Sequence, residues 1–543
     1  MLTRPMLFFN TVRYLKFRQI INRVKRNFLK PRVLPTGSPD IALLQERLEP
    51  VIKCQQKISH NGTLKFLNKE FNLSMIDDWN PSSQEKLWIY NLHYFDDLNS
   101  VNSEKRFSLH GCLIQKWIDE NPIGFGSGWE PYPSSLRIVN WIKWFLLNES
   151  VEKNWLHSLA NQARYLSQNI EYHLFGNHLI ANSKALIFAG LYFHGNEADE
   201  WYEAGIEIFS QELSEQILKD GGHFELSPMY HSIILEDLMD LINLHKAYNK
   251  DQPKNIIAKA AIMIQWLEIM CHPDGDISFF NDAAFSIAPS LNQLLIYAKQ
   301  LDIDYVSNNK SLIHLADSGY IKCESKNAVL LADVARVGPD YIPGHGHADT
   351  LSFELSLFGD RFIVNSGIST YKVGVERLKQ RGTLSHSSIT FDDKNSSEVW
   401  GGFRVAKRAK VYNITKDNDH KNNSFSACHD GYKRLNGVAV HCRKWSMSEN
   451  LLEIIDKISG DGYHKVTSVL PLHPNVLVSD IKSNSVSLNL ENNKIRVDFE
   501  GNGTLDVVDS KYHPEFGISI DNKQIIYNYN GILPFKLIMK ISW

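Results

Sequence analysis

The hydrophobic pattern of the chain changes its period once, near residues 305–318, and this change limits the fold more than any other feature. From about residue 85 to 305, apolar residues recur every three or four positions, the spacing of amphipathic helices. After about residue 315 the pattern becomes short alternating or β-branched runs, such as LSFELSLFG and KIRVDFEG, separated by turn residues. We therefore expect a multidomain α+β protein with an all-α half followed by an all-β half.

Short breaks rich in Gly, Pro and Asn, such as NPIGFGSG, FGNH and HPDGD, divide the helical half. Connections this short favour antiparallel helical hairpins. We predict a helical toroid or solenoid at 85–314 and an antiparallel β-sandwich at 315–543. The helices are expected near residues 111–119, 134–148, 153–170, 178–193, 199–218, 231–248, 253–271 and 289–301.

Residues 1–84 form an N-terminal arm in this interpretation. Within 11–32, apolar residues at helical spacing are interleaved with arginine and lysine, which predicts a basic amphipathic helix. Such a helix suits an anionic membrane surface or a polyanionic ligand. Packing against its own domain is the simpler explanation, and we favour it.

Composition excludes several classes of protein. Hydrophobic residues make up 43% and charged residues 22%, which is a globular composition, and no run approaches the ~20 apolar residues that span a bilayer. The formal net charge of −3 argues against nucleic-acid binding. Because Arg4 and Pro5 interrupt the apolar N-terminus, we see no signal peptide, and we expect a cytoplasmic protein, with a position peripheral to the inner membrane as the alternative.

The cysteines show no paired framework and no CxxC motif, so neither a disulfide scaffold nor a cysteine zinc site is expected. Reduced thiols agree with a cytoplasmic protein. The six cysteines are Cys54, Cys112, Cys271, Cys323, Cys428 and Cys442.

The densest polar cluster is GHGHADTLSFEL, residues 344–355, at the start of an apolar strand. His345 and His347 are two residues apart, so in a strand both imidazoles lie on one face. Such a pair can bind a metal or supply a base, although it also occurs as an ordinary polar strand edge. Arg336, at the end of the preceding run AVLLADVARV, is a candidate substrate-binding residue.

Two polar turns interrupt apolar helices in the helical half. FGNHLIANS contains Asn177 and His178, and GGHFELSPMYHS contains Tyr230 and His231. Both follow Gly or Pro breaks, which places them at helix ends beside a loop-lined cleft. Each alone is more often a cap than a catalyst, but their joint presence favours a site, with His178 and His231 binding substrate.

Residues 128–144, GWEPYPSSLRIVNWIKW, hold two further candidates for substrate binding. Trp129 offers a flat face of the kind that stacks on sugars. Arg137 can bind a carboxylate or sulfate through two hydrogen bonds, and an internal ion pair explains it equally well.

The order of these motifs resembles the heparinase II/III-like polysaccharide lyase family. The resemblance runs from about residue 85 to the C-terminus and implies an incomplete (α/α) toroid against an antiparallel β-sandwich, with the active site between them. It also implies that Asn177 neutralises a uronate carboxylate, that Tyr230 is the acid/base, and that His345 shares the base role. The segments that carry it are GNH, ELSPMYH, GHGHADTLSFEL, RFIVNSGISTY, SHSSITFDD, EVWGGFRV and YHPEFG.

The resemblance further implies a metal site at His347, residue 365 and His386, holding one divalent ion, zinc first, in a structural role. The family usually has an aspartate in the segment that reads VNSG here, so this chain has Asn365 instead. An amide oxygen is a weaker ligand for zinc than a carboxylate. A metal-free wall, in which the two histidines hydrogen-bond, is the alternative.

These residues can perform one kind of chemistry. The carbon-5 proton of a uronate becomes acidic only when a donor such as Asn177 stabilises the enolate that develops. A base then removes the proton, and an acid protonates the leaving oxygen, which cleaves an acidic polysaccharide by β-elimination. Reprotonation from the other face would instead make an epimerase for glycan biosynthesis. A non-catalytic glycan-binding protein is the third hypothesis, and Asn365 is the feature that suggests it.

Overall fold

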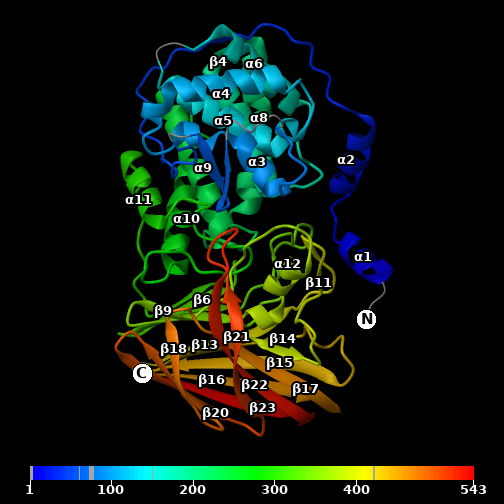
Figure 1. The fold of residues 1–543 in the computed structure, drawn as a ribbon, viewed down its shortest axis with the longest axis vertical. Coiled ribbons are helices and arrows are strands. Elements are labelled where there is room, and N and C mark those ends of the chain that lie inside the picture. Colours follow the sequence, from blue (N-terminus) through cyan, green and yellow to red (C-terminus); the bar gives the residue numbers. More distant parts are fainter. Residues whose placement is uncertain (1–3, 60–61, 73–78, 149–150, 420–421) are drawn as a thin grey trace.

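A computed structural model describes residues 4–59, 62–72, 79–148, 151–419 and 422–543. A helical half and a β half are stacked end to end along the longest axis (Figure 1). This arrangement confirms the α+β class expected from the change of hydrophobic period. Among the described helices, none has both the length and the apolar character that a bilayer-spanning segment needs.

Helices form wherever the three- and four-residue period predicts them, and all eight expected segments are confirmed. The central helix, α7, is buried along almost its whole length because its apolar residues surround it, and it packs against α5, α8 and α9. The resulting antiparallel hairpins make the incomplete toroid. The helices of this half are α3 (Lys86–Tyr94), α4 (Phe107–Glu120), α5 (Pro131–Leu146), α6 (Lys153–Ser167), α7 (Asn177–Tyr192), α8 (Asn196–Gln216), α9 (Pro228–Ala247), α10 (Ile256–Met270) and α11 (Leu291–Gln300).

Three antiparallel sheets in the described part of the chain build the β half. The first has the order β5-β6-β7-β8-β9, the second β10-β17-β22-β21, and the third β13-β14-β15-β16-β23-β20-β19-β18. The strands are β5 (Leu312–Leu315), β6 (Tyr320–Glu324), β7 (Ala328–Asp333), β8 (Phe353–Leu357), β9 (Asp360–Ile363), β10 (Ile389–Phe391), β13 (Val411–Asp419), β14 (Asn422–His429), β15 (Val438–Met447), β16 (Leu451–Gly460), β17 (Tyr463–Pro471), β18 (Val476–Ile481), β19 (Ser485–Leu490), β20 (Asn493–Glu500), β21 (Thr504–Tyr512), β22 (Ile520–Ile532) and β23 (Phe535–Ser542).

All three sheets share one apolar core. Phe353 of β8, Ile389 of β10 and Trp445 of β15 are buried in it together. In β23 every second residue is buried, which is the alternation that the sequence shows for a strand with one face on a core. The boundary predicted between residues 314 and 315 falls inside β5. The short α12 (Val375–Gln380) and the β11 (Val399–Trp400) and β12 (Arg404–Val405) pair lie on the side of this half that faces the toroid.

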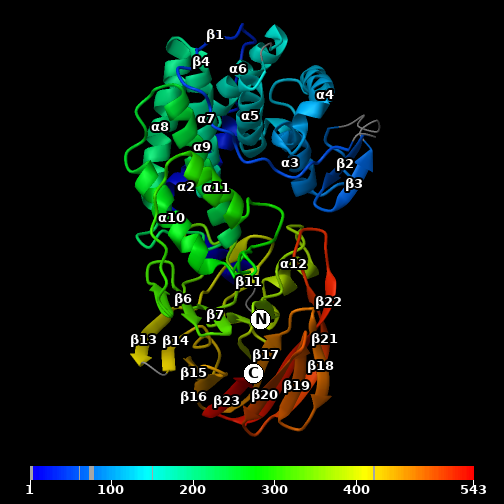
Figure 2. The ribbon, with the colours of Figure 1, turned by 90° about the vertical axis from the view of Figure 1, so that its left-hand side faces the viewer.

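The N-terminal arm follows the outside of the helical half (Figure 1). The predicted basic helix is broken into α1 (Arg4–Val12) and α2 (Phe17–Phe28). The arm then continues to β1 (Asp40–Ile41), which pairs with β4 (Phe193–His194). Figure 2 shows the hairpin of β2 (Thr63–Phe66) and β3 (Lys69–Asn72) beside α3.

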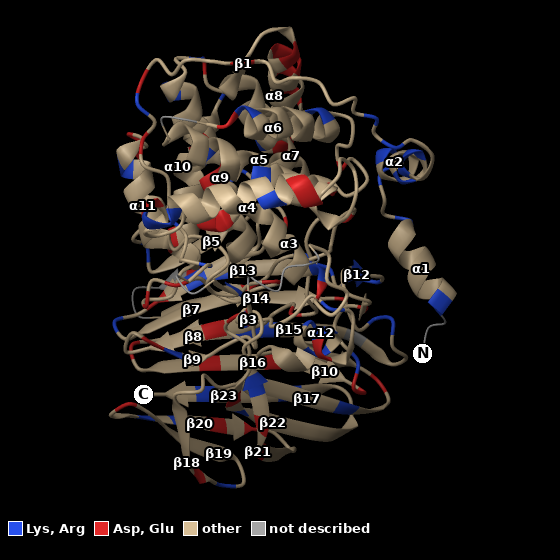
Figure 3. Cartoon of the chain, turned by 45° about the horizontal axis from the view of Figure 1, so that its top comes forward, with Lys and Arg blue, Asp and Glu red and all other residues tan. Residues whose placement is uncertain are grey.

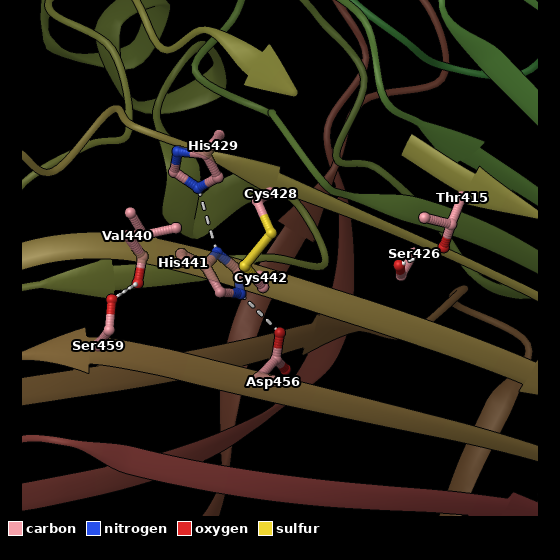
Figure 4. Close-up of a disulfide and its surroundings, with 9 residues drawn as sticks. All are labelled: Thr415, Ser426, Cys428, His429, Val440, His441, Cys442, Asp456 and Ser459. Carbon is pink, nitrogen blue, oxygen red and sulfur yellow. Dashed lines mark hydrogen bonds and ion pairs between the residues drawn. A yellow bond between two sulfur atoms is a disulfide. The ribbon is translucent and has the colours of Figure 1, made fainter. Parts of the chain in front are cut away.

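One disulfide corrects the expectation that all cysteines are reduced. Cys428 of β14 and Cys442 of β15 are direct cross-strand partners, and their sulfurs are bonded (Figure 4). The pair was missed because fourteen residues separate the two cysteines and only the strand register brings them together. A buried chain of polar groups lies beside it: His429 Nε2 is 3.1 Å from His441 Nδ1, and His441 Nε2 is 2.6 Å from Asp456 Oδ1.

The disulfide predicts how many thiols react in the unfolded protein. The structure has four free cysteines, so alkylation in denaturant without reductant should add four labels, and reduction beforehand should raise the number to six. Intact-mass spectrometry measures both numbers. Six labels without reduction, in protein purified under non-reducing conditions, would mean that Cys428 and Cys442 are thiols.

Candidate functional site

A cavity of about 1770 Å³ lies between the helical half and the β half. Asn177, His178 and Tyr230 line it from the toroid, and His345 and Tyr371 line it from loops of the β half. The motifs found separately in the sequence therefore meet at one place. The volume is large enough for several sugar units.

Asn177 is the first residue of α7, and the turn before it needs glycine. Gly176 has a φ of +65°, and a Cβ at this position would lie 2.4 Å from Glu225 Oε1. The close approach allows the backbone N–H of Asn177 to donate to Glu225 Oε1 at 2.9 Å. Its side-chain amide donates to both oxygens of the same carboxylate, at 3.1 and 3.2 Å.

Tyr230 lies in the first turn of α9. Ser227 caps this helix by accepting from the Tyr230 N–H at 3.2 Å, and Pro228 occupies the first helical position, where its missing N–H costs nothing. The Tyr230 hydroxyl is 3.0 Å from the Tyr371 hydroxyl. The pKa of Tyr230 is raised well above its usual value, mainly by burial and secondly by the neighbouring Tyr371. The phenol therefore keeps its proton at neutral pH.

His345 connects Tyr230 to two carboxylates. Its ring lies against the Tyr230 ring, with 4.0 Å between the centroids. His345 Nδ1 is 2.8 Å from Asp282 Oδ2, and Nε2 is 3.4 Å from Glu225 Oε2. Asn177 and His345 therefore share Glu225, which brings all three residues predicted to be catalytic into one cluster.

Asp282 is the fully buried carboxylate behind this cluster. It accepts from His345, from His347 Nε2 at 2.9 Å, and from both terminal nitrogens of Arg377. Burial would raise the pKa of Asp282, but Arg377 and the two histidines outweigh it and hold that pKa well below its usual value. A permanently charged Asp282 can only accept hydrogen bonds, so it fixes the donor nitrogen of each histidine.

Sequence reasoning missed Asp282, Glu225, Tyr371 and Arg377 as site residues. Glu225 and Tyr371 stand inside quoted motifs, GGHFELSPMYHS and RFIVNSGISTY, without an assigned role. Asp282 carried a weak signal, because a carboxylate in the otherwise apolar run FFNDAAF needs a partner. Arg377 carried none.

Of the residues expected to bind substrate, the structure brings only His178 to the cavity. Its ring packs on Tyr132, with centroids 4.6 Å apart. Burial lowers the pKa of His178, but Glu171, 3.0 Å away, outweighs it and raises that pKa overall.

The other four lie elsewhere, which corrects their assignment. Trp129 is only 3% exposed and packs against Trp117. Arg137 is fully buried and donates to Gln162, and His231 is fully buried and stacked on Trp266. Each of these three residues has a partner inside the protein and does not line the cavity. Arg336 is exposed and does not line the cavity either.

Of the three residues expected to hold a metal, His347 and His386 lie beside each other, whereas Asn365 contacts His386 from the other side. His347 Nδ1 and His386 Nε2 lie 3.3 Å apart, and a carboxylate oxygen of Asp349 lies within 4.8 Å of one ring nitrogen of each histidine. Asn365 Oδ1 instead lies 2.9 Å from the opposite nitrogen of His386, Nδ1. The structure therefore places Asp349, which sequence reasoning passed over, where Asn365 was expected.

The hydrogen bonds of the two histidines are compatible with a cation. His347 donates from Nε2 to the Asp282 carboxylate, so its Nδ1 carries a lone pair. With its proton on Nδ1, His386 donates to the Asn365 carbonyl and a second lone pair faces the first; with its proton on Nε2, His386 donates to His347 in a metal-free pair. In a tetrahedral zinc site with bonds of about 2.0–2.1 Å, two ligand nitrogens lie about 3.3 Å apart. The separation of His347 Nδ1 and His386 Nε2 has this value.

Comparison with known proteins identifies the family of the chain. The N-terminal family model, heparinase II/III N-terminus, matches residues 55–305, and the C-terminal model, heparinase II/III-like, matches residues 307–543. The chain belongs to the heparinase II/III-like family. A heparin-sulfate lyase of Pedobacter heparinus is 26% identical over 316 residues, which cover 51% of this chain and 47% of that protein.

Further relatives match shorter regions or the fold alone. A heparin-sulfate lyase of Bacteroides thetaiotaomicron is 31% identical over 147 residues, 25% of this chain and 21% of that protein. The chain thus spans half or less of the length of these curated relatives. A crystal structure of heparinase III superposes with a TM-score of 0.70 at 17% identity, covering 97% of this chain and 89% of that one. A chondroitin AC lyase of Streptomyces coelicolor reaches a TM-score of 0.52 at 8% identity, covering 83% and 74%.

Asp282 supplies a test of the site's stability. Asp282→Asn leaves Arg377 buried without its counter-charge, which should cost about 3–5 kcal/mol of unfolding free energy. Urea unfolding measures it. Asp521→Asn is the matched control, because Asp521 and its partner Lys511 are both exposed, 88% and 47%, and exposed pairs contribute only about 0–1 kcal/mol. Equal losses in the two variants would contradict a special role for Asp282.

Proposed function

We propose that this protein is a polysaccharide lyase that cleaves a uronate-containing glycosaminoglycan or similar acidic polysaccharide by β-elimination. The observation that carries the proposal is the convergence of Asn177, Tyr230 and His345 in the interdomain cavity. The names of the relatives, heparin-sulfate lyase and chondroitin AC lyase, support the same substrate class.

Asn177 is suited to stabilise the enolate. Its amide donates to the Glu225 carboxylate in the free protein, so it is already aimed at a carboxylate-shaped acceptor. Asn177 and Tyr230 both lie in the first turn of a helix, α7 and α9, and helix N-termini favour negative charge. A uronate carboxylate bound there meets preorganised donors as its charge grows.

His345 and Tyr230 are suited to divide the proton transfers. Because the Tyr230 phenol keeps its proton, it can act as the acid for the leaving glycosidic oxygen. His345 donates from Nδ1 to Asp282, which leaves Nε2 on the side of Glu225 and the cavity as the base for the carbon-5 proton. Their rings are in contact, with 4.0 Å between the centroids, so acid and base could act on neighbouring atoms of one sugar link.

The cavity also carries positive charge without internal partners. Among the described residues, no carboxylate lies within ion-pair distance of the side chains of Arg23, Lys65, Lys372 or Arg404, all of which line the cavity. Burial and then the neighbouring Arg404 lower the pKa of Arg23, which shows that two like charges are close together. Like charges held together on a cavity rim favour an anionic ligand.

We infer further that His347, His386 and Asp349 hold one zinc ion, with Asn365 orienting His386. Bound there, the ion would brace the wall beneath His345 as a structural metal. The separation of the two nitrogens, which is that of two ligands in a tetrahedral site, and the nearby carboxylate of Asp349 support this inference.

The lyase proposal predicts a sharp loss of activity for Tyr230→Phe. Removing the acid should lower kcat about 10²–10⁴-fold, because general acid–base catalysis contributes that much. The assay follows ultraviolet absorbance of the unsaturated uronate formed from heparan sulfate, chondroitin sulfate and other uronate polymers. Tyr341→Phe is the matched control, since Tyr341 also lines the cavity but its hydroxyl donates to Glu215.

The same assay run in deuterated water separates the alternatives. An epimerase would place deuterium in the intact polymer without absorbance, because the same enolate is reprotonated and no bond is broken. Binding of the polymer with neither signal would mean a glycan-binding protein without turnover. Either outcome, with the full panel of polymers, would contradict the lyase.

The zinc inference predicts different effects for two conservative variants. Asp349→Asn removes a carboxylate ligand and should weaken zinc affinity about tenfold or more, whereas Asn365→Asp keeps the acceptor for His386 and should leave affinity within about threefold. Competition with a chelating dye measures both, and elemental analysis should find one zinc per chain. No zinc in the protein as purified, together with no rise of Tm on adding zinc, would overturn the inference.

A further inference from the structure

The helix α2 turns its apolar side away from the protein. Phe17, Ile20, Val24 and Phe28 fall within an arc of about 80° when 3.6 residues make a turn, and we call these four residues the apolar stripe. Their exposed fractions are 76%, 40%, 53% and 81%. A helix that packs on its own domain usually buries such a stripe, whereas α2 packs on its domain, as favoured from the sequence, through its other side.

The polar side of α2 makes the contacts with the protein instead. Gln19 is 1% exposed and donates to the carbonyl oxygens of Leu174 and Tyr341 at 3.4 and 3.3 Å. Arg26, on the same side of the helix, is 2.5 Å from His173 Nε2. These polar anchors fix the rotation of α2 and hold the apolar stripe outward.

Positive charge surrounds the apolar stripe. Residues 1–39 contain nine arginines and lysines and no aspartate or glutamate, although the whole chain has a formal net charge of −3. Figure 3 shows the Lys and Arg positions of α2 in blue at the outer edge of the molecule. Neighbouring apolar residues of the arm are also more than half exposed: Met6, Phe8, Phe9, Leu29 and Leu34.

We propose that the apolar stripe of α2 docks on the surface of an anionic lipid bilayer. Exposed aromatic and aliphatic residues flanked by arginine and lysine are what an interfacial helix presents to headgroups and acyl chains. Basic residues beside an anionic leaflet add to the binding. A second copy of this chain fits less well, because symmetric pairing of two stripes would place two strongly basic helices side by side.

Docking would hold the mouth of the cavity near the bilayer. Phe8, Val12 and Leu15 of the arm line the cavity, as does Gln19 of α2. The same segment therefore forms both the cavity rim and the lipid-facing surface. A membrane-associated or lipid-linked glycan would then reach the site without the enzyme leaving the surface.

Vesicle sedimentation of the full chain tests the proposal. Vesicles of phosphatidylglycerol and phosphatidylcholine should bind the protein, pure phosphatidylcholine should bind it more weakly, and raising NaCl from about 0.1 to 0.5 M should weaken the binding. The triple variant Phe17→Ser, Val24→Ser, Phe28→Ser should bind at least about tenfold more weakly than the wild type, because its lipid-facing apolar area is lost. These positions are exposed, so their replacement leaves the fold intact.

A matched control replaces exposed apolar residues far from the arm. Leu477→Ser with Ile532→Ser, in β18 and β22 and 65% and 68% exposed, should bind vesicles like the wild type. Cleavage of a soluble substrate by the triple variant should equal that of the wild type, so failure of docking and failure of the lyase proposal are separate results. The proposal would be overturned if the wild-type protein did not bind anionic vesicles, or if the triple variant bound them like the wild type. A dimer in sedimentation velocity that the triple variant loses, without vesicle binding, would assign the stripe to a second copy.

Discussion

The buried carboxylate of Asp282 is the interaction on which the site depends. It lies between the toroid and the sandwich and accepts from His345, His347 and Arg377, which all come from the β half. A charge with no access to water is stable only with such partners, so Asp282 ties the two halves together at the point where they form the cavity. The same bonds orient His345 toward the cavity and His347 toward His386.

Two helix N-termini supply the other residues of the proposed catalytic cluster. The toroid directs the first turns of α7 and α9 at the cavity, which brings Asn177 and Tyr230 within reach of His345. The positive ends of these helices and the unpaired cations of the rim act in the same electrostatic direction. The N-terminal arm adds further positive charge beside the cavity, and α2 uses its polar side as an anchor and leaves its apolar stripe exposed.

Much of the fold could be predicted because secondary structure follows from local periodicity. All eight expected helical segments exist, and α3 escaped prediction because its apolar residues are interrupted by Asn91 and His93. Asn177, Tyr230 and His345 attracted attention because polar residues inside apolar runs are locally visible.

The sequence by itself determined the order and type of the elements and the motifs that lie at their ends. Only the tertiary structure decided which distant residues meet: Asp282 with His345, Asp349 with His386, and Cys428 with Cys442. It also decided which residues lose their access to the cavity, and which side of α2 faces water. The physical reason is that burial, pairing and helix rotation depend on packing between segments far apart in the chain, whereas hydrophobic period is a property of neighbours.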